Sequence, residues 1–346
     1  MKVNAWAATT AGQPIAFHPI ERREVGPKDV LIDILWSGIC HSDIHQARAE
    51  WGAALFPMVP GHEIVGRVSK VGAQVSKLKV GDFAGVGCMV DSCRECRSCK
   101  HGDEQFCDAG CAFTYNSTEM DRKTPTFGGY SAQVVVTEHF ALKVPSTMDL
   151  ARAAPLLCAG ITTYSPLREF DVKRGDKVAV NGLGGLGHMA VKLAAAMGAE
   201  VTMLSTSASK KADAQKLGAS NFELTTEKGT FKKLRNHFDL IIDTVSAQHD
   251  INALLGIVRP YGTVALVGVP PQAMPLSAFA VINGNKRFAG SNIGGIVETQ
   301  EMLEFCAEKN IGADVEVIEA KDINVAYERM LKNDVRYRFV IDAKSF

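Results

Sequence analysis

The sequence predicts an α/β protein of two domains, one β-rich and the other a doubly wound parallel sheet. Three observations support this prediction. The chain has 346 residues, more than one hydrophobic core usually serves. Up to about residue 150 it carries short apolar runs separated by glycine and proline. Beyond residue 153 strand-like and helix-like patterns alternate, which is typical of a parallel sheet covered on both faces.

The individual elements are predicted from the period and length of the apolar runs. Strands are expected at residues 30–35, 64–68, 134–136, 177–180, 201–204, 240–243, 263–267 and 339–342. Helices are expected at residues 187–197, 210–217 and 298–309.

Composition and charge exclude several classes of function. Basic and acidic residues both number 38, so the net charge is zero and nothing favours a nucleic-acid or anionic-membrane partner. No charge-free apolar stretch reaches the roughly 18 residues of a membrane span, and the first residues carry no secretory pattern. We therefore expect a cytoplasmic protein with no membrane and no nucleic-acid partner.

A glycine-rich motif indicates a dinucleotide site. It consists of Gly182, Leu183, Gly184, Gly185, Leu186 and Gly187. The motif fits G-x-G-x-x-G, follows an apolar strand and opens a helix, which is the context of a pyrophosphate-binding turn in a Rossmann domain. The alternative is a glycine turn that serves packing alone, and the flanking strand–helix–strand pattern argues against it.

The end of the second strand of this domain predicts which dinucleotide binds. An NAD site usually has an acid there, but no Asp or Glu lies between Val201 and Lys211. The segment instead offers the hydroxyls of Ser205, Thr206 and Ser207 followed by Lys210. Hydroxyl donors and positive charge suit a 2′-phosphate, so NADP(H) is expected. The alternative is an ordinary solvated loop with a helix cap.

Six of the nine cysteines crowd one segment. Four of them have the spacing of a closed tetrahedral site, which holds structural zinc: Cys93, Cys96, Cys99 and Cys107. An iron–sulfur cluster is disfavoured, because its bacterial motif places the fourth cysteine after three residues rather than seven. The flanking Cys88 and Cys111 are interpreted as plain thiols.

A second set of possible metal ligands is scattered along the chain. Cys40, His62 and Cys158 would leave a fourth position open, as in catalytic zinc sites, and Glu63 stands beside the histidine. Taken singly, a cysteine or histidine is more often a side chain without a metal than a ligand, and the surrounding residues favour the metal site.

These motifs together resemble those of the zinc-containing medium-chain alcohol dehydrogenases. Within that family the chain is most similar to the cinnamyl alcohol dehydrogenase branch, which includes bacterial NADPH-dependent aldehyde reductases. The resemblance extends from end to end and is carried by residues 40–43, 61–63, 113–116, 156–160, 182–187, 294–301 and 334–340.

The resemblance implies a GroES-like catalytic domain at residues 1–152 and 292–346, and a Rossmann domain at residues 153–291. It implies two zinc ions per chain, one on the four-cysteine segment and one on Cys40, His62 and Cys158, with Glu63 as an exchangeable ligand. Asp43 would orient His62.

Further roles follow from the same resemblance. Ser42 would pass a proton from the alcohol, and His45 would deliver it to solvent. Thr162 would lie against the nicotinamide, and Val267 and Ser291 would complete the cofactor contacts. A homodimer is expected on the same ground.

The expected function is NADP(H)-dependent interconversion of primary alcohols with aromatic or medium-chain aldehydes. Trp51 and Phe113 are the favoured pocket walls, and Asn292 replaces the bulky aromatic of the plant lignin enzymes. Two alternatives stay open: an NAD-dependent polyol or simple alcohol dehydrogenase, and a zinc-lobe binding protein without catalysis. Coenzyme preference would separate the first, and zinc content the second.

Overall fold

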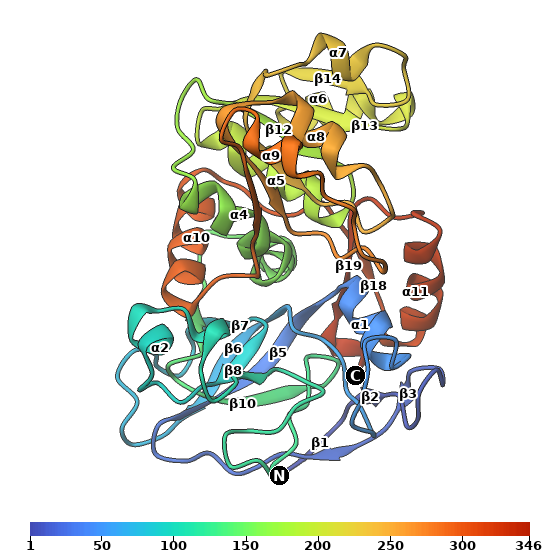
Figure 1. Ribbon diagram of the computed structural model, residues 1–346. Coiled ribbons are helices and arrows are strands. Elements are labelled where there is room, and N and C mark those ends of the chain that lie inside the picture. The colour runs from blue at the N-terminus through green and yellow to red at the C-terminus, as the bar shows by residue number, and fades with distance from the viewer. The chain divides into compact units, whose positions relative to one another are not determined.

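In the computed structural model, a seven-stranded sheet organises the first part of the chain (Figure 1). The strand order is β11-β7-β6-β5-β19-β18, and β10 also pairs with β5. All of these pairs are antiparallel except β18 with β19. The apolar run at the start of β5 (Asp29–Ile39) is buried along most of its length, because strands cover both of its edges.

The strands of this sheet include the four predicted from apolar runs. Besides β5 they are β6 (Ile64–Val71), β7 (Phe83–Val86), β10 (Gln133–Thr137), β11 (Leu142–Lys143), β18 (Val315–Ile318) and β19 (Arg338–Asp342). Short two-stranded ribbons are formed by β1 (Lys2–Val3), β4 (Ile20–Glu21), β2 (Trp6–Ala7), β3 (Ala16–Phe17), β8 (Met89–Asp91) and β9 (Ala112–Phe113).

Helices of this part connect the strands and cover the core. They are α1 (His41–Ala47), α2 (Arg97–His101), α3 (Leu150–Ala153), α10 (Ile296–Glu308) and α11 (Ile323–Leu331), with the 3-10 turns η1 (Glu104–Phe106), η2 (Ala154–Leu157), η4 (Ala320–Asp322) and η5 (Ala343–Ser345). The apolar face of α11 packs against residues of α1 and β19 in one buried cluster, so this cluster supports α1.

The second part of the chain is a six-stranded, fully parallel sheet in the order β14-β13-β12-β15-β16-β17. The order reverses at β12, the first of these strands along the chain. In doubly wound folds the crevice at such a switch point binds ligands at the carboxyl ends of the strands. The predicted Rossmann domain is therefore confirmed.

The strands of this sheet are β12 (Lys177–Asn181), β13 (Glu200–Ser205), β14 (Asn221–Leu224), β15 (Phe238–Asp243), β16 (Val258–Leu266) and β17 (Arg287–Gly290). The helices are α4 (Ala159–Glu169), α5 (Gly185–Ala196), α6 (Lys211–Leu217), α7 (Thr230–Lys233), α8 (Ile251–Ile257) and α9 (Ala278–Ile282), with the 3-10 turn η3 (Ala208–Lys210). The edge strands β14 and β17 were not expected, because neither has a long apolar run.

The structure describes residues 1–346 and divides them into two units, Met1–Ile161 with Gly294–Phe346, and Thr162–Ile293. The domain boundaries predicted at residues 152 and 292 stay a prediction and lie close to the limits of these two units. η2 packs on β5, β6 and β7 and so belongs to the first unit. Composition could not reveal that packing. No helix in either unit has the length and apolar character needed to cross a lipid bilayer.

Candidate metal and dinucleotide sites

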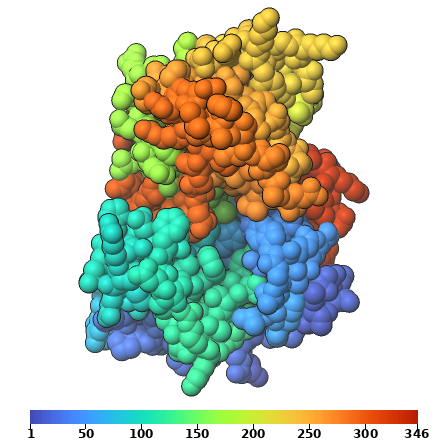
Figure 2. Space-filling model, viewed as in Figure 1, coloured from blue at the N-terminus to red at the C-terminus, as the bar shows by residue number.

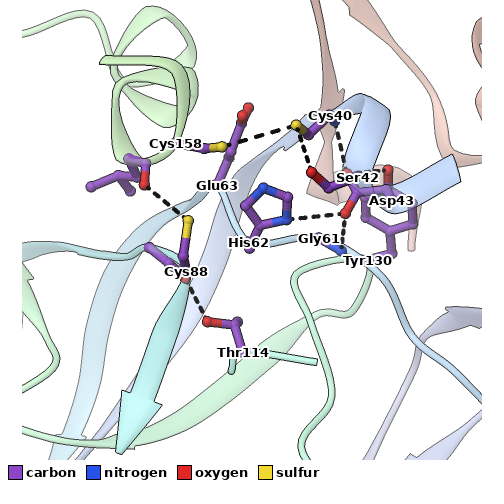
Figure 3. Close-up of polar contacts among 12 residues, drawn as sticks. Cys40, Ser42, Asp43, Gly61, His62, Glu63, Cys88, Thr114, Tyr130 and Cys158 are labelled. Carbon is purple, nitrogen blue, oxygen red and sulfur yellow. Dashed lines mark hydrogen bonds and ion pairs between the residues drawn. The ribbon is translucent and has the colours of Figure 1, made fainter. Parts of the chain in front are cut away.

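Four potential metal ligands converge inside the first unit (Figure 3). The ligand atoms of Cys40, His62, Glu63 and Cys158 all lie within 4.8 Å of one another, and all four residues are buried. We call these residues the buried donor set. Cys40 precedes α1, the two central residues precede β6, and Cys158 follows η2. Three separate chain segments thus bring the predicted ligands together.

The sulfur atoms of this set have the spacing that zinc requires. Cys40 Sγ lies 3.9 Å from Cys158 Sγ. Two thiolates bound about 2.3 Å from one tetrahedral zinc ion would be about 3.8 Å apart. The hydrogen bond between the two thiols lowers the pKa of Cys40 and raises that of Cys158. One of the pair is therefore ready to act as a thiolate, and a bound cation would favour the ionised form of both.

Asp43 orients His62 within the set. Its side chain is fully buried in the first turn of α1, and it accepts hydrogen bonds from the backbone N–H groups of Cys40 (2.8 Å) and Gly61 (3.1 Å). His62 Nδ1 lies 3.1 Å from Asp43 Oδ1. Because a carboxylate only accepts, Nδ1 carries the hydrogen and Nε2 remains as the ligand atom. Burial lowers the pKa of His62, but the charges of Asp43 and Cys88 and the hydrogen bonds with Asp43 and Cys40 together outweigh it and raise this pKa well above the usual value.

Glu63 has one engaged oxygen and one free oxygen. Oε1 pairs with the guanidinium of Arg338, which is 2% exposed, whereas the buried Oε2 has no hydrogen-bond partner. An unpartnered carboxylate oxygen beside two thiols and an imidazole is costly unless a cation compensates it. The residues therefore fit zinc, which would bind the free Glu63 oxygen while the other oxygen pairs with Arg338.

The four cysteines at residues 93–107, here called the cysteine lobe, form a second donor group. The ligand atoms of Cys93, Cys96, Cys99 and Cys107 also lie within 4.8 Å of one another. Backbone N–H groups donate to three of the sulfurs, for example from Cys96 to Cys93 Sγ at 3.3 Å. Backbone hydrogen bonds of this kind lower the pKa of Cys93 to about 6. Four sulfurs form a closed site, which suits a structural ion. Figure 2 shows the lobe in teal on the surface of the first unit.

A buried carboxylate joins the cysteine lobe to α10. Glu104 is 1% exposed, and it accepts a hydrogen bond from the first N–H of α10, that of Ile296, at 3.0 Å. Its other oxygen lies 2.8 Å from His139 Nε2. Burial raises the pKa of Glu104, but these hydrogen bonds outweigh it, and the pKa is lowered below its ordinary value. The anion also suits the positive end of the helix dipole.

The two predicted proton-transfer residues lie on α1. Ser42 Oγ lies 3.6 Å from Cys40 Sγ, beside the buried donor set. His45, one turn further along, has its Nδ1 2.5 Å from Glu50 Oε2, and the ring of Trp51 stacks on it at a centroid distance of 4.8 Å. Trp51 and Phe113, the favoured pocket walls, are 50% and 48% exposed, so neither is used in the core.

The glycine motif in the second unit forms the turn between β12 and α5. Gly182 has a φ of 93°, in the left-handed region that favours glycine. A Cβ on Gly187 would lie 1.9 Å from the carbonyl oxygen of Gly182, so a larger residue cannot fit there. A Cβ on Gly184 would meet no atom within 4 Å. The turn thus closes on itself at its ends and presents open backbone in its middle, as a pyrophosphate site requires.

The predicted 2′-phosphate residues lie at the carboxyl end of β13. Ser205 Oγ accepts a hydrogen bond from the N–H of Ser207 at 3.1 Å, and Thr206 is exposed. Lys210 Nζ donates to the carbonyl of Leu183 at 2.7 Å, and burial lowers the pKa of Lys210. The lysine therefore brings its amine against the glycine turn. No acidic residue occupies this strand end.

The three remaining predicted cofactor residues lie at a sheet edge or in a helix of this part of the chain. Val267 and Ser291 follow the carboxyl ends of β16 and β17, so they share the sheet edge at which β12 leads into the glycine turn. Thr162 is buried in α4.

Three residues at the sites were missed by sequence reasoning: Arg338, Glu50 and Tyr130. Arg338 stood only within a resemblance motif, and its partner Glu63 is 275 residues away. Tyr130, whose hydroxyl donates to Asp43 at 3.2 Å, lies 87 residues from it. No local spacing rule links such pairs. Glu50 could have been suspected, because an acid five residues after His45 can meet it at the end of a short helix.

Comparison with known proteins agrees with this geometry. The family model for the alcohol dehydrogenase GroES-like domain matches residues 26–146, and that for zinc-binding dehydrogenases matches residues 185–308. NADP-dependent alcohol dehydrogenase C 1 of Mycolicibacterium smegmatis is 54% identical over 99% of this chain and 98% of its own length. Aldehyde reductase YahK of Escherichia coli is 50% identical over 100% of this chain and 99% of its own.

A solved structure extends the comparison to three dimensions. Cinnamyl alcohol dehydrogenase SbCAD4 from Sorghum bicolor superposes with a TM-score of 0.96 at 44% identity, covering 99% of this chain and 98% of its own. The fold and the buried donor set define an oxidoreductase of the zinc-binding dehydrogenase class. The chain belongs to the alcohol dehydrogenase family with a GroES-like domain and a zinc-binding dehydrogenase domain.

Proposed function

We propose that the chain is a zinc-dependent, NADP(H)-dependent alcohol dehydrogenase that reduces aromatic and medium-chain aldehydes to primary alcohols and catalyses the reverse reaction. The buried donor set carries this proposal, because it combines two thiols, one oriented imidazole and a carboxylate shared with Arg338. The two thiols and the imidazole would hold one ion, and the fourth position would open to substrate when Glu63 pairs with Arg338 alone. A zinc ion held by Cys40, His62 and Cys158 would supply Lewis-acid stabilisation of negative charge on the substrate oxygen, and bound NADPH would supply the hydride.

Side chains of the protein would transfer the proton between substrate and solvent. In the reducing direction the substrate oxygen gains a proton, and the Ser42 hydroxyl lies beside the donor set, 3.6 Å from Cys40 Sγ. His45 is half-buried, pairs with Glu50 and stacks on Trp51, so it would carry the proton between Ser42 and solvent. The exposed rings of Trp51 and Phe113 supply apolar surface for an aromatic or aliphatic aldehyde.

The proposal includes two zinc ions per chain, the second on the cysteine lobe as a structural ion. It includes NADP(H) because Ser205, Thr206, Ser207 and Lys210 offer donors and charge at a strand end without an acid. The names of the relatives from M. smegmatis and E. coli support the choice of cofactor and of aldehyde substrates. A cytoplasmic location fits nine free cysteines, several of which must stay reduced to bind metal.

We also infer a homodimer formed through the second unit. β17 is an edge strand of the parallel sheet, and the adjoining α9 exposes Phe279 (73%) and Ile282 (64%). An unpaired edge beside large exposed apolar side chains is a surface that a second copy would cover. Sedimentation of the purified protein at twice the mass of one chain would support this, and a monomer would contradict it.

The function is tested by measuring turnover of an aldehyde panel with NADPH and with NADH, together with the zinc content. We expect two zinc ions per chain and a higher kcat/KM with NADPH. Cys158→Ala should abolish turnover and keep NADPH binding, whereas Cys306→Ala, a buried cysteine outside both donor groups, should keep both. Turnover that survives Cys158→Ala would refute the assignment of the catalytic site.

A further inference from the structure

A pair of buried tyrosine hydroxyls continues from Asp43 into the core of the first unit. Tyr130, which is 0% exposed, donates to Asp43 Oδ2 at 3.2 Å. Tyr327, which is 5% exposed and lies on α11, donates to the Tyr130 hydroxyl at 3.4 Å. Figure 3 shows Tyr130 against Asp43, on the side of the carboxylate away from the sulfur atoms. The hydroxyl pair thus links α11 to the carboxylate that orients a metal ligand.

Tyr130 supplies one of the hydrogen bonds that hold Asp43, and Tyr115 also interacts with this carboxylate. Oδ1 receives Gly61 N–H and His62 Nδ1, and Oδ2 receives Cys40 N–H and the Tyr130 hydroxyl. Each oxygen therefore has two donors, and the pair of bonds on Oδ2 opposes rotation of the carboxylate. A buried charge without enough donors is costly, so this arrangement is favoured over any in which the carboxylate turns away from His62.

Tyr327 determines the direction of the Tyr130 hydroxyl. A hydroxyl has one hydrogen and can also accept. Because Tyr327 donates to the Tyr130 oxygen, the hydrogen of Tyr130 remains available for Asp43. Successive hydroxyls oriented in this way polarise one another, which strengthens the final bond to the carboxylate.

We propose that Tyr130, with Tyr327 behind it, is a positioning residue for the metal ligand His62. It acts by holding the Asp43 carboxylate in the orientation that accepts from Nδ1, so that Nε2 faces the sulfur atoms of Cys40 and Cys158. The inference rests on the proposed zinc site at the buried donor set. Partners that stand behind metal ligands commonly change metal affinity by about 10- to 100-fold when removed.

Both tyrosines also pack in the hydrophobic cluster beneath the site, so a test must separate the hydroxyl from the ring. Tyr130→Phe and Tyr327→Phe remove only the hydroxyl and keep the ring. Tyr261→Phe is the matched control, because Tyr261 is 66% exposed and belongs to the second unit. The cysteine lobe is an internal control in the same molecule, since neither tyrosine touches it.

The experiment uses the zinc-loaded protein and follows zinc release to a chromophoric chelator. Release from the buried donor set is separated from release from the lobe by the Cys158→Ala protein, which keeps only lobe zinc. We expect Tyr130→Phe to release the buried zinc about tenfold faster and to leave lobe zinc unchanged. Tyr327→Phe should also accelerate release of the buried zinc, but by a smaller factor. In the Tyr130→Phe background the second substitution should add nothing, because Tyr327 acts through Tyr130.

A spectroscopic readout distinguishes positioning from loss of stability. Cobalt in place of the buried zinc absorbs visible light according to its ligand geometry, so Tyr130→Phe should shift that spectrum and Tyr261→Phe should not. An unchanged spectrum with unchanged release would overturn the inference, as would equal acceleration of both zinc ions. If Tyr130→Phe fails to fold, Tyr327→Phe carries the same test. A wild-type protein that binds only lobe zinc would instead refute the proposed function.

Discussion

Replacing Gly187 by alanine tests the closure of the glycine turn most directly. The added Cβ would lie 1.9 Å from the Gly182 carbonyl oxygen and 3.0 Å from its carbon, whereas ordinary contact begins at 3.4 Å. The obstacle is backbone, which cannot rotate aside as a side chain can. The amino end of α5 must therefore move away from the end of β12 by more than an ångström.

The expected cost follows from that displacement. Overpacking a tight contact costs about 1–3 kcal/mol. A change of 1 kcal/mol lowers the melting temperature of a large domain by roughly 2–4 °C, so a fall of several degrees is expected. Moving the helix end also weakens its hydrogen bonds to the pyrophosphate. Loss of one charged hydrogen bond, about 1.5–3 kcal/mol, corresponds to roughly 10- to 100-fold weaker NADPH binding.

Gly184→Ala is the matched control. Its Cβ would meet no atom within 4 Å, and its φ of −135° suits alanine. The variant should therefore melt like the wild type and still bind NADPH less tightly, because the methyl group occupies the space through which the pyrophosphate approaches. Thermal unfolding without cofactor and fluorescence titration with NADPH measure both quantities. If Gly187→Ala melts and binds as the wild type does, or if Gly184→Ala is the less stable variant, our account of the turn is wrong.

Three further predictions concern other parts of the chain. Cys99→Ser should remove about one zinc per chain and lower thermal stability, because the lobe is a closed site, while Cys111→Ser should do neither; full zinc content in Cys99→Ser would contradict this. Ser205→Asp should lower kcat/KM with NADPH by roughly 10- to 100-fold and spare NADH, since an acid repels the 2′-phosphate; an unmoved ratio would contradict the cofactor assignment. Glu104→Gln should lower stability above its ordinary pKa of 4.5. Because folding lowers this pKa, the difference in unfolding free energy between wild type and variant should vanish as the pH falls through the pKa of the folded protein. Urea unfolding at several pH values measures this difference, and a difference that does not change with pH would contradict the prediction.

Local sequence patterns predict those parts of the sites whose residues lie close together along the chain. The four lobe cysteines lie within fifteen residues, and the structure brings their sulfur atoms together around one short helix. The glycine turn is continuous, and its strand and helix contexts were readable from the apolar period. The hydroxyls and Lys210 at the end of β13 follow within a few residues of one another. In each case backbone geometry over a few residues limits where the side chains can go.

The buried donor set was named from the sequence only through resemblance. Cys40 and Cys158 are 118 residues apart, and nothing in their immediate neighbours requires them to meet. The structure places them 3.9 Å apart because β5 and η2 pack together. The same packing places η2 in the first unit.

By itself the sequence determined the fold class, the closed cysteine site and the cofactor preference we expect, because spacing and apolar period are local properties of a chain. Only the tertiary structure decided which distant groups complete those sites. Antiparallel pairing of β19 with β5 sets Phe339 opposite Ile39, which brings the adjoining Arg338 to Glu63. Packing of α11 beneath α1 brings Tyr327 to Tyr130 and so to Asp43. Strand register and helix packing depend on the burial of the whole core, and no short segment contains that information.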